Sequence, residues 1–264
     1  VKLMEAGENI FLHGEAGTGK TAVINEFIGL NREQVISLAP TGMAARNLQY
    51  GGMTLHRFLQ LFERAGDEMD RLLAIAKTIV IEEISMVRSD LLDALDQQLR
   101  RVAVYRRPFG GLQVVAVGDF YQLPPVVKTR EEECFLQRNH GGIFAFETAA
   151  WKAAGFKSVC LKTIHRQNDP EFLALLRAIR NCPADLRQQL RRYDTRLHRD
   201  PSPQARRLCC SRVVTAHINR RILKELCTPR QTFLGVCKGL YPQREWPTEL
   251  MLELKFDMFV LILA

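Results

Sequence analysis

What this sequence of 264 residues lacks narrows the classes of protein it can belong to. Its seven cysteines include no pair at the short spacing of a zinc site, and their odd number fits reduced thiols in an intracellular compartment. The final apolar run, Met258 to Ala264, is far too short to span a bilayer, and the first residues do not resemble a secretory signal. We therefore expect an intracellular protein with no membrane partner: cytoplasmic if bacterial, nuclear or mitochondrial if eukaryotic.

Composition describes an ordinary globular chain with a basic bias. It is 47% hydrophobic and 25% charged, and its formal net charge is +8. The length suits one large domain or two smaller ones. Arginines crowd the stretch from Arg187 to Arg212. Such a stretch fits phosphate contacts, a solvated surface or a mobile linker, and the sequence leaves these three open.

Apolar runs alternate with helical patterns in the first part of the chain. Buried strands are predicted at Asn9 to His13, Val35 to Ala39, Thr78 to Ile81 and Val114 to Val117, and helices at Ala22 to Leu30, Leu55 to Glu63 and Asp90 to Val102. This alternation predicts an α/β fold with a parallel sheet and helices on both faces.

A second, less regular α/β unit is expected after Trp151. Its predicted elements are a strand at Ser158 to Leu161, a helix from Asp169-Pro170 to Asn181, a strand at Arg207 to Ser211 and a helix at Thr215 to Leu226. We place the two domains at residues 1–155 and 156–264. The segment from Cys227 to Glu249 is rich in turn formers and receives no assignment.

The segment from Gly14 to Thr21 reads Gly14-Glu15-Ala16-Gly17-Thr18-Gly19-Lys20-Thr21 and lies between a predicted strand and a predicted helix. This is the context that a phosphate-binding loop needs. Glycines let backbone N–H groups turn toward phosphate oxygens, and the helix directs its positive end at the same anion. We expect Lys20 to reach the β- and γ-phosphates of ATP and Thr21 to hold Mg²⁺.

Two acids, Glu82 and Glu83, follow the apolar run Thr78 to Ile81. A carboxylate at a strand end can hold the Mg²⁺ shell, and its neighbour can orient or deprotonate the attacking water. We assign Glu82 to magnesium and Glu83 to the water.

Further candidates follow later strands. Gln122, in Gly118-Asp119-Phe120-Tyr121-Gln122, is neutral and polar and suits a sensor of the γ-phosphate. Arg166 lies in Ile164-His165-Arg166-Gln167. It could reach across a domain cleft and supply the positive charge that stabilises phosphoryl transfer. A surface arginine at a helix start is an equally good reading of Arg166 on these grounds alone.

Taken in order, these motifs resemble those of the Pif-one-type helicases, a superfamily-one branch that moves 5′→3′ on single-stranded DNA. The resemblance runs from about Asn9 to Arg180 and is carried by the elements GEAGTGKT, APTGMAARNL, GGMTLHRF, IEEISMV, PFGGLQVVAVGDFYQLPPV and IHRQ. It is fainter over Leu208 to Leu226 and at Leu254 to Leu263.

The resemblance implies an ATP-driven DNA motor of two RecA-like domains, the second only partly present. Such a motor would act as a monomer on single-stranded DNA and on forked or tailed duplexes, in replication, repair, recombination or telomere maintenance. It implies catalytic roles for Lys20, Glu83, Gln122 and Arg166, and DNA-backbone contacts for Pro40, Thr41, Gly42 and His56. Phosphate contacts of this kind do not read sequence. Phe58 and Phe120 are candidates for base stacking, but core or hinge packing is the stronger expectation.

The chain departs from the family pattern in two respects. The family has Asp-Glu where this chain has Glu82-Glu83, and Mg²⁺ demands near-ideal octahedral geometry, so we expect slower hydrolysis. A glutamine upstream of the first strand and the late family motifs do not appear, so we expect a fragment or a truncated product.

Three alternatives differ in what they predict. A binding module would hold nucleotide and single-stranded DNA without unwinding duplexes. A RecD-like relative would share the polarity of movement. A P-loop kinase or switch NTPase would transfer phosphate to a small molecule, and leaves the GDFYQLPP and GGMTLHRF elements unexplained.

Overall fold

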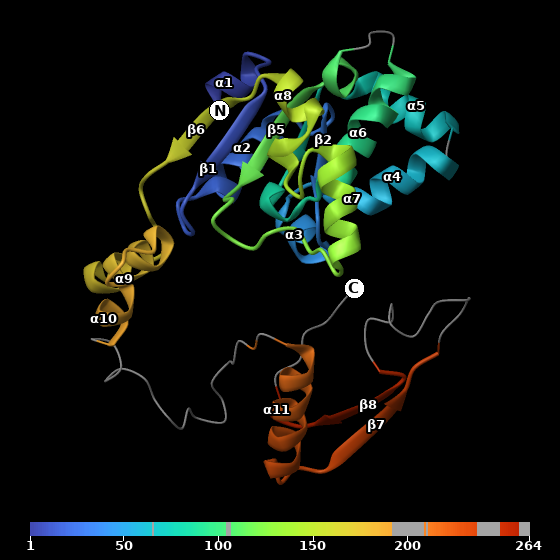
Figure 1. Cartoon of the computed structure of the whole chain (residues 1–264). Coiled ribbons are helices and arrows are strands. Elements are labelled where there is room, and N and C mark those ends of the chain that lie inside the picture. The colour runs from blue at the N-terminus through green and yellow to red at the C-terminus, as the bar shows by residue number, and fades with distance from the viewer. Residues whose placement is uncertain (65, 104–106, 192–208, 210, 237–248, 259–264) are drawn as a thin grey trace. The chain divides into compact units, whose positions relative to one another are not determined.

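Residues 1–64, 66–103, 107–191, 209, 211–236 and 249–258 are described by a computed structural model of the chain (Figure 1). The chain divides into two compact units, residues 1–189 and 190–264. No helix of the described residues is long and apolar enough to cross a bilayer.

Up to residue 191 the elements are α1 (Lys2–Glu5), β1 (Ile10–Gly14), α2 (Lys20–Asn31), β2 (Val35–Ala39), α3 (Gly42–Asn47), β3 (Met53–Thr54), α4 (Leu55–Arg64), α5 (Gly66–Ile75), β4 (Thr78–Ile81), η1 (Ile84–Met86), α6 (Ser89–Val102), η2 (Pro108–Gly111), β5 (Gln113–Gly118), α7 (Arg130–His140), η3 (Ala145–Glu147), α8 (Ala149–Ala154), β6 (Lys157–Leu161), α9 (Pro170–Asn181) and α10 (Leu186–Arg191). Beyond it they are α11 (Arg212–Glu225), β7 (Arg230–Leu234) and β8 (Met251–Lys255). The four strands and three helices predicted for the first part of the chain are present, with ends shifted by at most a few residues.

The first unit is built on a six-stranded sheet with the order β3-β2-β4-β5-β1-β6. Every neighbouring pair in it runs parallel. Figure 1 shows β6, β1 and β5 side by side, connected through helices. The predicted α/β class with a parallel sheet is therefore confirmed.

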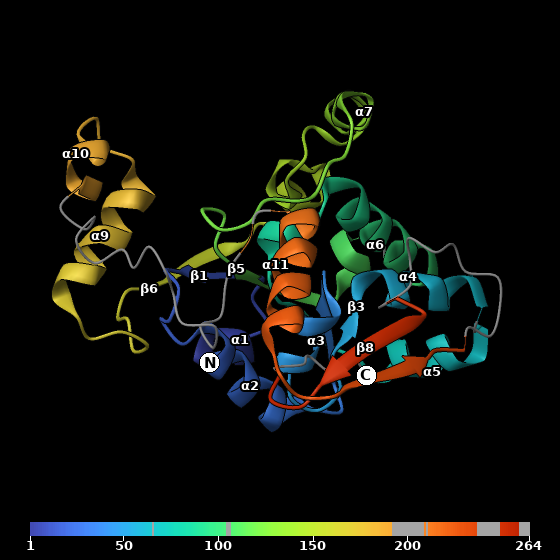
Figure 2. The same ribbon diagram turned by 90° about the horizontal axis from the view of Figure 1, so that it is seen from below.

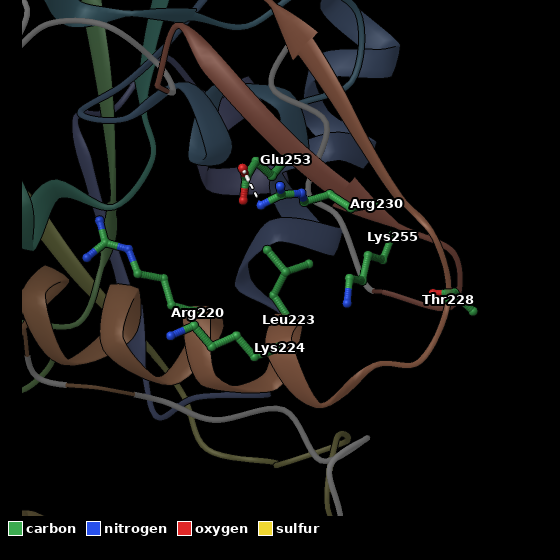
Figure 3. A pocket seen from close by; sticks show the side chains of 7 residues that line it. All are labelled: Arg220, Leu223, Lys224, Thr228, Arg230, Glu253 and Lys255. Carbon is green, nitrogen blue, oxygen red and sulfur yellow. Dashed lines mark hydrogen bonds and ion pairs between the residues drawn. The ribbon is translucent and has the colours of Figure 1, made fainter.

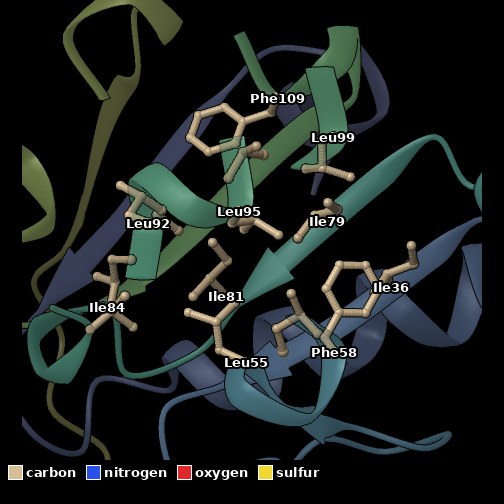
Figure 4. Packing of buried hydrophobic residues seen from close by; sticks show 14 of the residues in the cluster. Ile36, Leu55, Phe58, Ile79, Ile81, Ile84, Leu92, Leu95, Leu99 and Phe109 are labelled. Carbon is tan, nitrogen blue, oxygen red and sulfur yellow. The ribbon is translucent and has the colours of Figure 1, made fainter. Parts of the chain in front are cut away.

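Both faces of this sheet are buried, because its central strands carry apolar side chains at nearly every position. Ile79 and Ile81 of β4 face one core with helices α4, α5, α6 and α8, whereas Val80 between them faces a second core with α2 and α3. Alternate strand residues point to opposite faces, so one apolar strand supplies both cores. Figure 2 shows α2 and α6 on opposite sides of the strands, and Figure 4 shows Phe58, Leu95 and Phe109 packed in the first core.

The strand expected to begin the second unit belongs to the first. β6 pairs in parallel with β1, from Ile10 opposite Lys157 to Gly14 opposite Leu161, and forms an edge of the six-stranded sheet. The first compact unit accordingly extends to residue 189 rather than 155. The sequence of a strand does not determine which sheet it joins. β6 pairs with β1, along the side of β1 that no other strand occupies. The division into two motor domains stays a prediction.

In the second unit, the predicted helix is present as α11, which Ser211 caps through a hydrogen bond from the Val214 N–H. β7 and β8 form an antiparallel pair, with Arg230 opposite Lys255. β7 lies in the segment that the sequence left unassigned. The strand predicted at Arg207 to Ser211 falls mostly outside the described residues, as do most of the Arg187 to Arg212 cluster and the end of the Leu254 to Leu263 resemblance.

Candidate functional site

The predicted site residues gather along one edge of the sheet. All six strands are parallel, so their carboxyl ends share that edge, and each motif directly follows a strand. Along the sheet order, His56 follows β3, Thr41 follows β2, Glu82 follows β4, Gln122 follows β5, the phosphate-binding loop follows β1 and Arg166 follows β6. In open α/β sheets ligands bind outside this edge. The DNA-side candidates thus follow β3 and β2, and the nucleotide-side candidates follow the other four strands.

The phosphate-binding loop leads from β1 into α2. Gly19 stands at the helix N-cap with a φ of 87°, in the left-handed region that favours glycine. Nζ of Lys20 donates to the backbone oxygens of Gly14 at 2.8 Å and Glu15 at 3.1 Å. Burial lowers the pKa of Lys20, while Asp119, Glu83 and Glu82 oppose the shift. The lysine is therefore held at the loop, among carboxylates.

A pocket of about 470 Å³ lies over this loop. Its lining comprises Ala16, Gly17, Thr18, Gly19, Lys20, Thr21, Ala22, Glu82, Glu83, Gln122, His165 and Arg166. All the predicted nucleotide-side residues line it except Gly14 and Glu15, whose carbonyls instead accept hydrogen bonds from Lys20. The pocket is open to solvent and rich in polar side chains, as a site for a charged nucleotide requires.

The two residues predicted to hold magnesium are in direct contact. Oγ1 of Thr21 donates to Oε1 of Glu82 at 2.6 Å. Glu82 is only 5% exposed, and its other oxygen, Oε2, has no hydrogen-bond partner among the described residues. Burial raises the pKa of Glu82, and the neighbouring Glu83 carboxylate adds to the rise. A buried carboxylate with a spare oxygen is poised to gain from a cation.

Glu83, the predicted water-activating acid, lies in a strained backbone conformation. Its φ is 52° and its ψ is 45°, in the left-handed region that a glutamate rarely adopts. Such strain costs on the order of 1–3 kcal/mol and persists where the surrounding structure enforces it. Here the residue joins buried β4 to η1, and its side chain lines the pocket beside Glu82.

Gln122, in the loop after β5, and Arg166, in the loop after β6, line the same pocket. Nε2 of Gln122 donates to Oδ2 of Asp119 at 3.2 Å. Arg166 lies against the phosphate-binding loop, since a Cβ added to Gly17 would meet the Cβ of Arg166 at 2.6 Å. The backbone N–H of His165 also donates to the oxygen of Gly17 at 2.8 Å. No larger residue fits at Gly17 unless the segment that carries Arg166 moves.

The candidates for DNA contact lie over β2 and β3, which are adjacent in the sheet. Thr41 caps α3, and its hydroxyl accepts a hydrogen bond from the Ala44 N–H at 3.2 Å. Gly42 and His56 are exposed, and Pro40 is partly so. Donors at a helix start beside solvent suit contact with a phosphate backbone.

The two aromatic candidates for base stacking pack inside the first unit. Phe58 is fully buried in the core beneath α4. Phe120 contacts the rings of Phe11, Phe146 and Trp151, with centroids between 4.7 and 6.2 Å away. The expectation of core packing is confirmed for both.

One ion pair beside the pocket has no counterpart among the sequence-based predictions. Arg180 of α9 donates from both terminal nitrogens to Asp119, at 2.6 and 2.8 Å. Asp119 is 2% exposed. Burial alone would raise its pKa, but hydrogen bonds from Arg180, from the Tyr121 N–H and from Gln122 outweigh burial and lower it. The position of Asp119 just after a strand could have marked it as a candidate site residue. No pattern in the sequence indicates that it pairs with Arg180, which lies 61 positions later.

The second unit has a basic pocket of its own, of about 460 Å³ (Figure 3). Arg220, Leu223 and Lys224 line it from α11, and Thr228, Arg230, Glu253 and Lys255 from the β7–β8 side. Arg230 is paired with Glu253 at 2.9 Å, and Nζ of Lys255 donates to the Leu226 carbonyl at 2.6 Å. Glu249 also pairs with Arg220 at 3.7 Å, so four cations stand against two carboxylates, and the excess of positive charge favours an anionic ligand.

Comparisons of the sequence and of the structure with known proteins both find PIF1 helicases. A sequence model described as PIF1-like helicase matches residues 2–181. The chain is 37% identical over 199 residues to the ATP-dependent DNA helicase PIF1 of Saccharomyces cerevisiae, and 34% identical over 236 residues to that of Homo sapiens. A crystal structure of Pif1 helicase from Bacteroides, in complex with ADP-AlF3 and ssDNA, superposes with a TM-score of 0.79 at 33% identity.

These matches cover most of this chain but only part of each relative. They include 68% of the chain against the yeast protein, 83% against the human one and 96% against the Bacteroides structure. The chain spans 22% of the yeast protein, 35% of the human protein and 62% of the Bacteroides chain.

Proposed function

We propose that this chain, which belongs to the PIF1-like helicase family, is the ATP-hydrolysing part of a 5′→3′ DNA helicase motor. The observation that carries the proposal is the pocket at the carboxyl edge of the sheet. It combines a phosphate-binding loop, an acid pair, Gln122 and Arg166. The Bacteroides relative, which holds ADP-AlF3 and ssDNA, supports both ligand classes. The relatives are named PIF1, which favours this reading over a RecD-like one.

Each side chain has a proposed task in ATP hydrolysis. The loop N–H groups and Lys20 bind the β- and γ-phosphates. Glu83 accepts a proton from the attacking water, and Gln122 senses the γ-phosphate. Arg166 offsets the negative charge that develops on the transferred phosphoryl group.

Magnesium fits the residues present. Glu82 has a buried oxygen without a hydrogen-bond partner in the described part of the chain, and the Thr21 hydroxyl lies at its other oxygen. Hydroxyl and carboxylate oxygens are ligands that Mg²⁺ prefers. Thr21 and Glu82 would hold the ion, which neutralises phosphate charge when bound.

Single-stranded DNA is the proposed second ligand, bound over β2 and β3. Pro40, Thr41, Gly42 and His56 would contact its backbone, and a motor must bind backbone rather than bases if it is to move along any sequence. The nucleotide and DNA candidates both follow the carboxyl ends of strands of the same sheet. We propose that a conformational change on ATP hydrolysis reaches the DNA contacts through this sheet. We propose that the protein acts as a monomer on tailed or forked duplexes.

The test is ATP hydrolysis and strand separation on a duplex with a 5′ tail, measured for the chain and for its Lys20→Ala variant. We expect DNA-stimulated ATPase activity that Lys20→Ala abolishes. ATPase activity indifferent to DNA would contradict the helicase proposal, and activity that survives Lys20→Ala would contradict the nucleotide site.

The second candidate function is a module that binds nucleotide and single-stranded DNA without unwinding. It is favoured by the placement of the binding residues, because those proposed for nucleotide and those proposed for DNA all lie within the first compact unit. DNA-stimulated hydrolysis without strand separation on the same 5′-tailed duplex would support it.

A further inference from the structure

α9 lies against the nucleotide site although it has almost no apolar anchorage there. All its residues are described, and none of its side chains is buried. Phe172, Leu176 and Ile179 are 38%, 41% and 48% exposed. Helices are ordinarily held by an apolar face packed on a core. The placement of α9 therefore needs another cause.

Polar contacts from the last turns of α9 supply that cause. Arg180 makes a two-pronged ion pair with Asp119, at 2.6 and 2.8 Å, and its guanidinium also lies 4.2 Å from the ring centroid of Tyr121. The Asp119 carboxylate is almost fully buried, and planar forked pairing of this kind fixes direction as well as distance. Arg177, one turn earlier, lies 3.8 Å from Glu15, which is a longer contact between side chains that are 55% and 33% exposed.

The contact partner, Asp119, belongs to the loop that carries Gln122. The same carboxylate accepts hydrogen bonds from the Tyr121 N–H at 3.1 Å and from Nε2 of Gln122 at 3.2 Å. At the other end of α9, Arg166 precedes the Asp169 cap by three residues and lies against Gly17. One ion pair thus connects the loop of Gln122 with the helix that follows Arg166.

We propose that Arg180 is a positioning residue of the nucleotide site: its ion pair with Asp119 holds α9, and with it Arg166, at the pocket. This inference rests on the proposed ATPase function. Arg180 does not line the pocket, so it acts through Arg166 rather than on ATP. A displacement of about 1 Å of a catalytic group can cost on the order of 100-fold in rate.

The first test is a double-mutant cycle on the turnover number for ATP. We expect Arg180→Gln to lower kcat by about 10- to 100-fold with little change in KM, because the lost interaction is made in the transition state. Arg180→Lys keeps the positive charge but cannot donate two parallel hydrogen bonds to Asp119. Its kcat should therefore lie between those of Arg180→Gln and the unaltered chain. In an Arg166→Ala background the further loss from Arg180→Gln should shrink to less than about threefold. An undiminished loss there would overturn the proposal.

The second test does not depend on catalysis. Hydrogen–deuterium exchange of the nucleotide-free chain should show faster exchange over residues 171–181 and 119–122 in Arg180→Gln than in the unaltered chain. Arg177→Ala is the matched control and should leave both segments unchanged, because its ion pair is longer and more exposed than that of Arg180. Unchanged exchange in Arg180→Gln would overturn the proposal even if the chain hydrolyses ATP. Faster exchange in a chain without ATPase activity would instead support the tether and contradict the proposed function.

Discussion

The hydroxyl of Thr21 donates a 2.6 Å hydrogen bond to Oε1 of Glu82, and so joins the start of α2 to the end of β4. These are the two residues proposed to hold magnesium. The bond uses one carboxylate oxygen and leaves Oε2 buried without a partner in the described part of the chain. Glu82, which is one methylene longer than the aspartate that the family resemblance implies here, is in direct contact with the Thr21 hydroxyl.

Shortening that side chain should increase ATP hydrolysis. Glu82→Asp moves the carboxylate back by one methylene and leaves room for a water in the octahedral shell that Mg²⁺ demands. We expect a few-fold rise in kcat, measured by phosphate release at saturating ATP and magnesium. Glu26→Asp, at a position of α2 outside the pocket, is the control. No gain in Glu82→Asp would count against the geometric explanation.

Removing the charge of Glu83 should separate hydrolysis from binding. We expect Glu83→Gln to reduce kcat by about 10²- to 10⁴-fold, the usual contribution of a general base. Affinity for a fluorescent ATP analogue should change little, because the residue acts on water rather than on the nucleotide. A loss of affinity as large as the loss of rate would assign Glu83 to binding instead.

The pH dependence of activity should carry the signature of Glu82. Burial, with the Glu83 charge, raises the pKa of Glu82 above its ordinary 4.5, so the carboxyl stays protonated to a higher pH than an exposed glutamate. The ionised form binds magnesium, and activity should therefore fall as pH decreases, starting above pH 4.5. Higher magnesium concentrations should move this fall to lower pH, because the cation favours the ionised carboxylate.

The measurement is kcat/KM against pH at two magnesium concentrations. Glu82→Gln cannot ionise at this position, and its residual activity should lack the magnesium-dependent shift. An acid limb that does not respond to magnesium would assign the titration to another group.

Substitution of His56 should weaken DNA binding selectively. His56→Ala should raise the single-stranded DNA concentration for half-maximal ATPase stimulation several-fold, with an unchanged melting temperature, because the side chain is exposed. Gln60→Ala, also exposed on α4, is the control. Thr41→Ala is less clean, since losing its helix cap also costs about 1 kcal/mol of folding stability. Equal responses of His56→Ala and Gln60→Ala would contradict the assignment.

The basic pocket of the second unit should contribute to affinity for DNA. Lys224→Glu reverses a charge among Arg220, Arg230 and Lys255. We expect weaker binding to single-stranded DNA of every sequence and a shallower dependence of affinity on salt, by about 0.7 for each phosphate that the protein no longer neutralises. Fluorescence anisotropy over a salt series measures both. Val213→Glu, at an exposed position on the same helix, tests whether added negative charge alone has this effect.

Local pattern was enough to predict five of the six strands of the sheet, but not the two-residue β3. The runs at Val35 to Ala39 and Thr78 to Ile81 are strands with those same bounds, because a strand buried on both faces is apolar at most of its positions. The loop from Gly14 to Thr21 was recognisable because phosphate binding constrains consecutive backbone atoms, and those constraints leave their mark in consecutive residues.

Pairing across long distances was decided by tertiary structure. β6 joined the first sheet, contrary to the predicted boundary, because an edge was available at β1 and no local pattern encodes that choice. The bond between Thr21 and Glu82 and the ion pair between Asp119 and Arg180 each join residues 61 positions apart. Residue types in the sequence name the groups that can react. Only the folded sheet, through the parallel direction of its strands, brings them to one pocket.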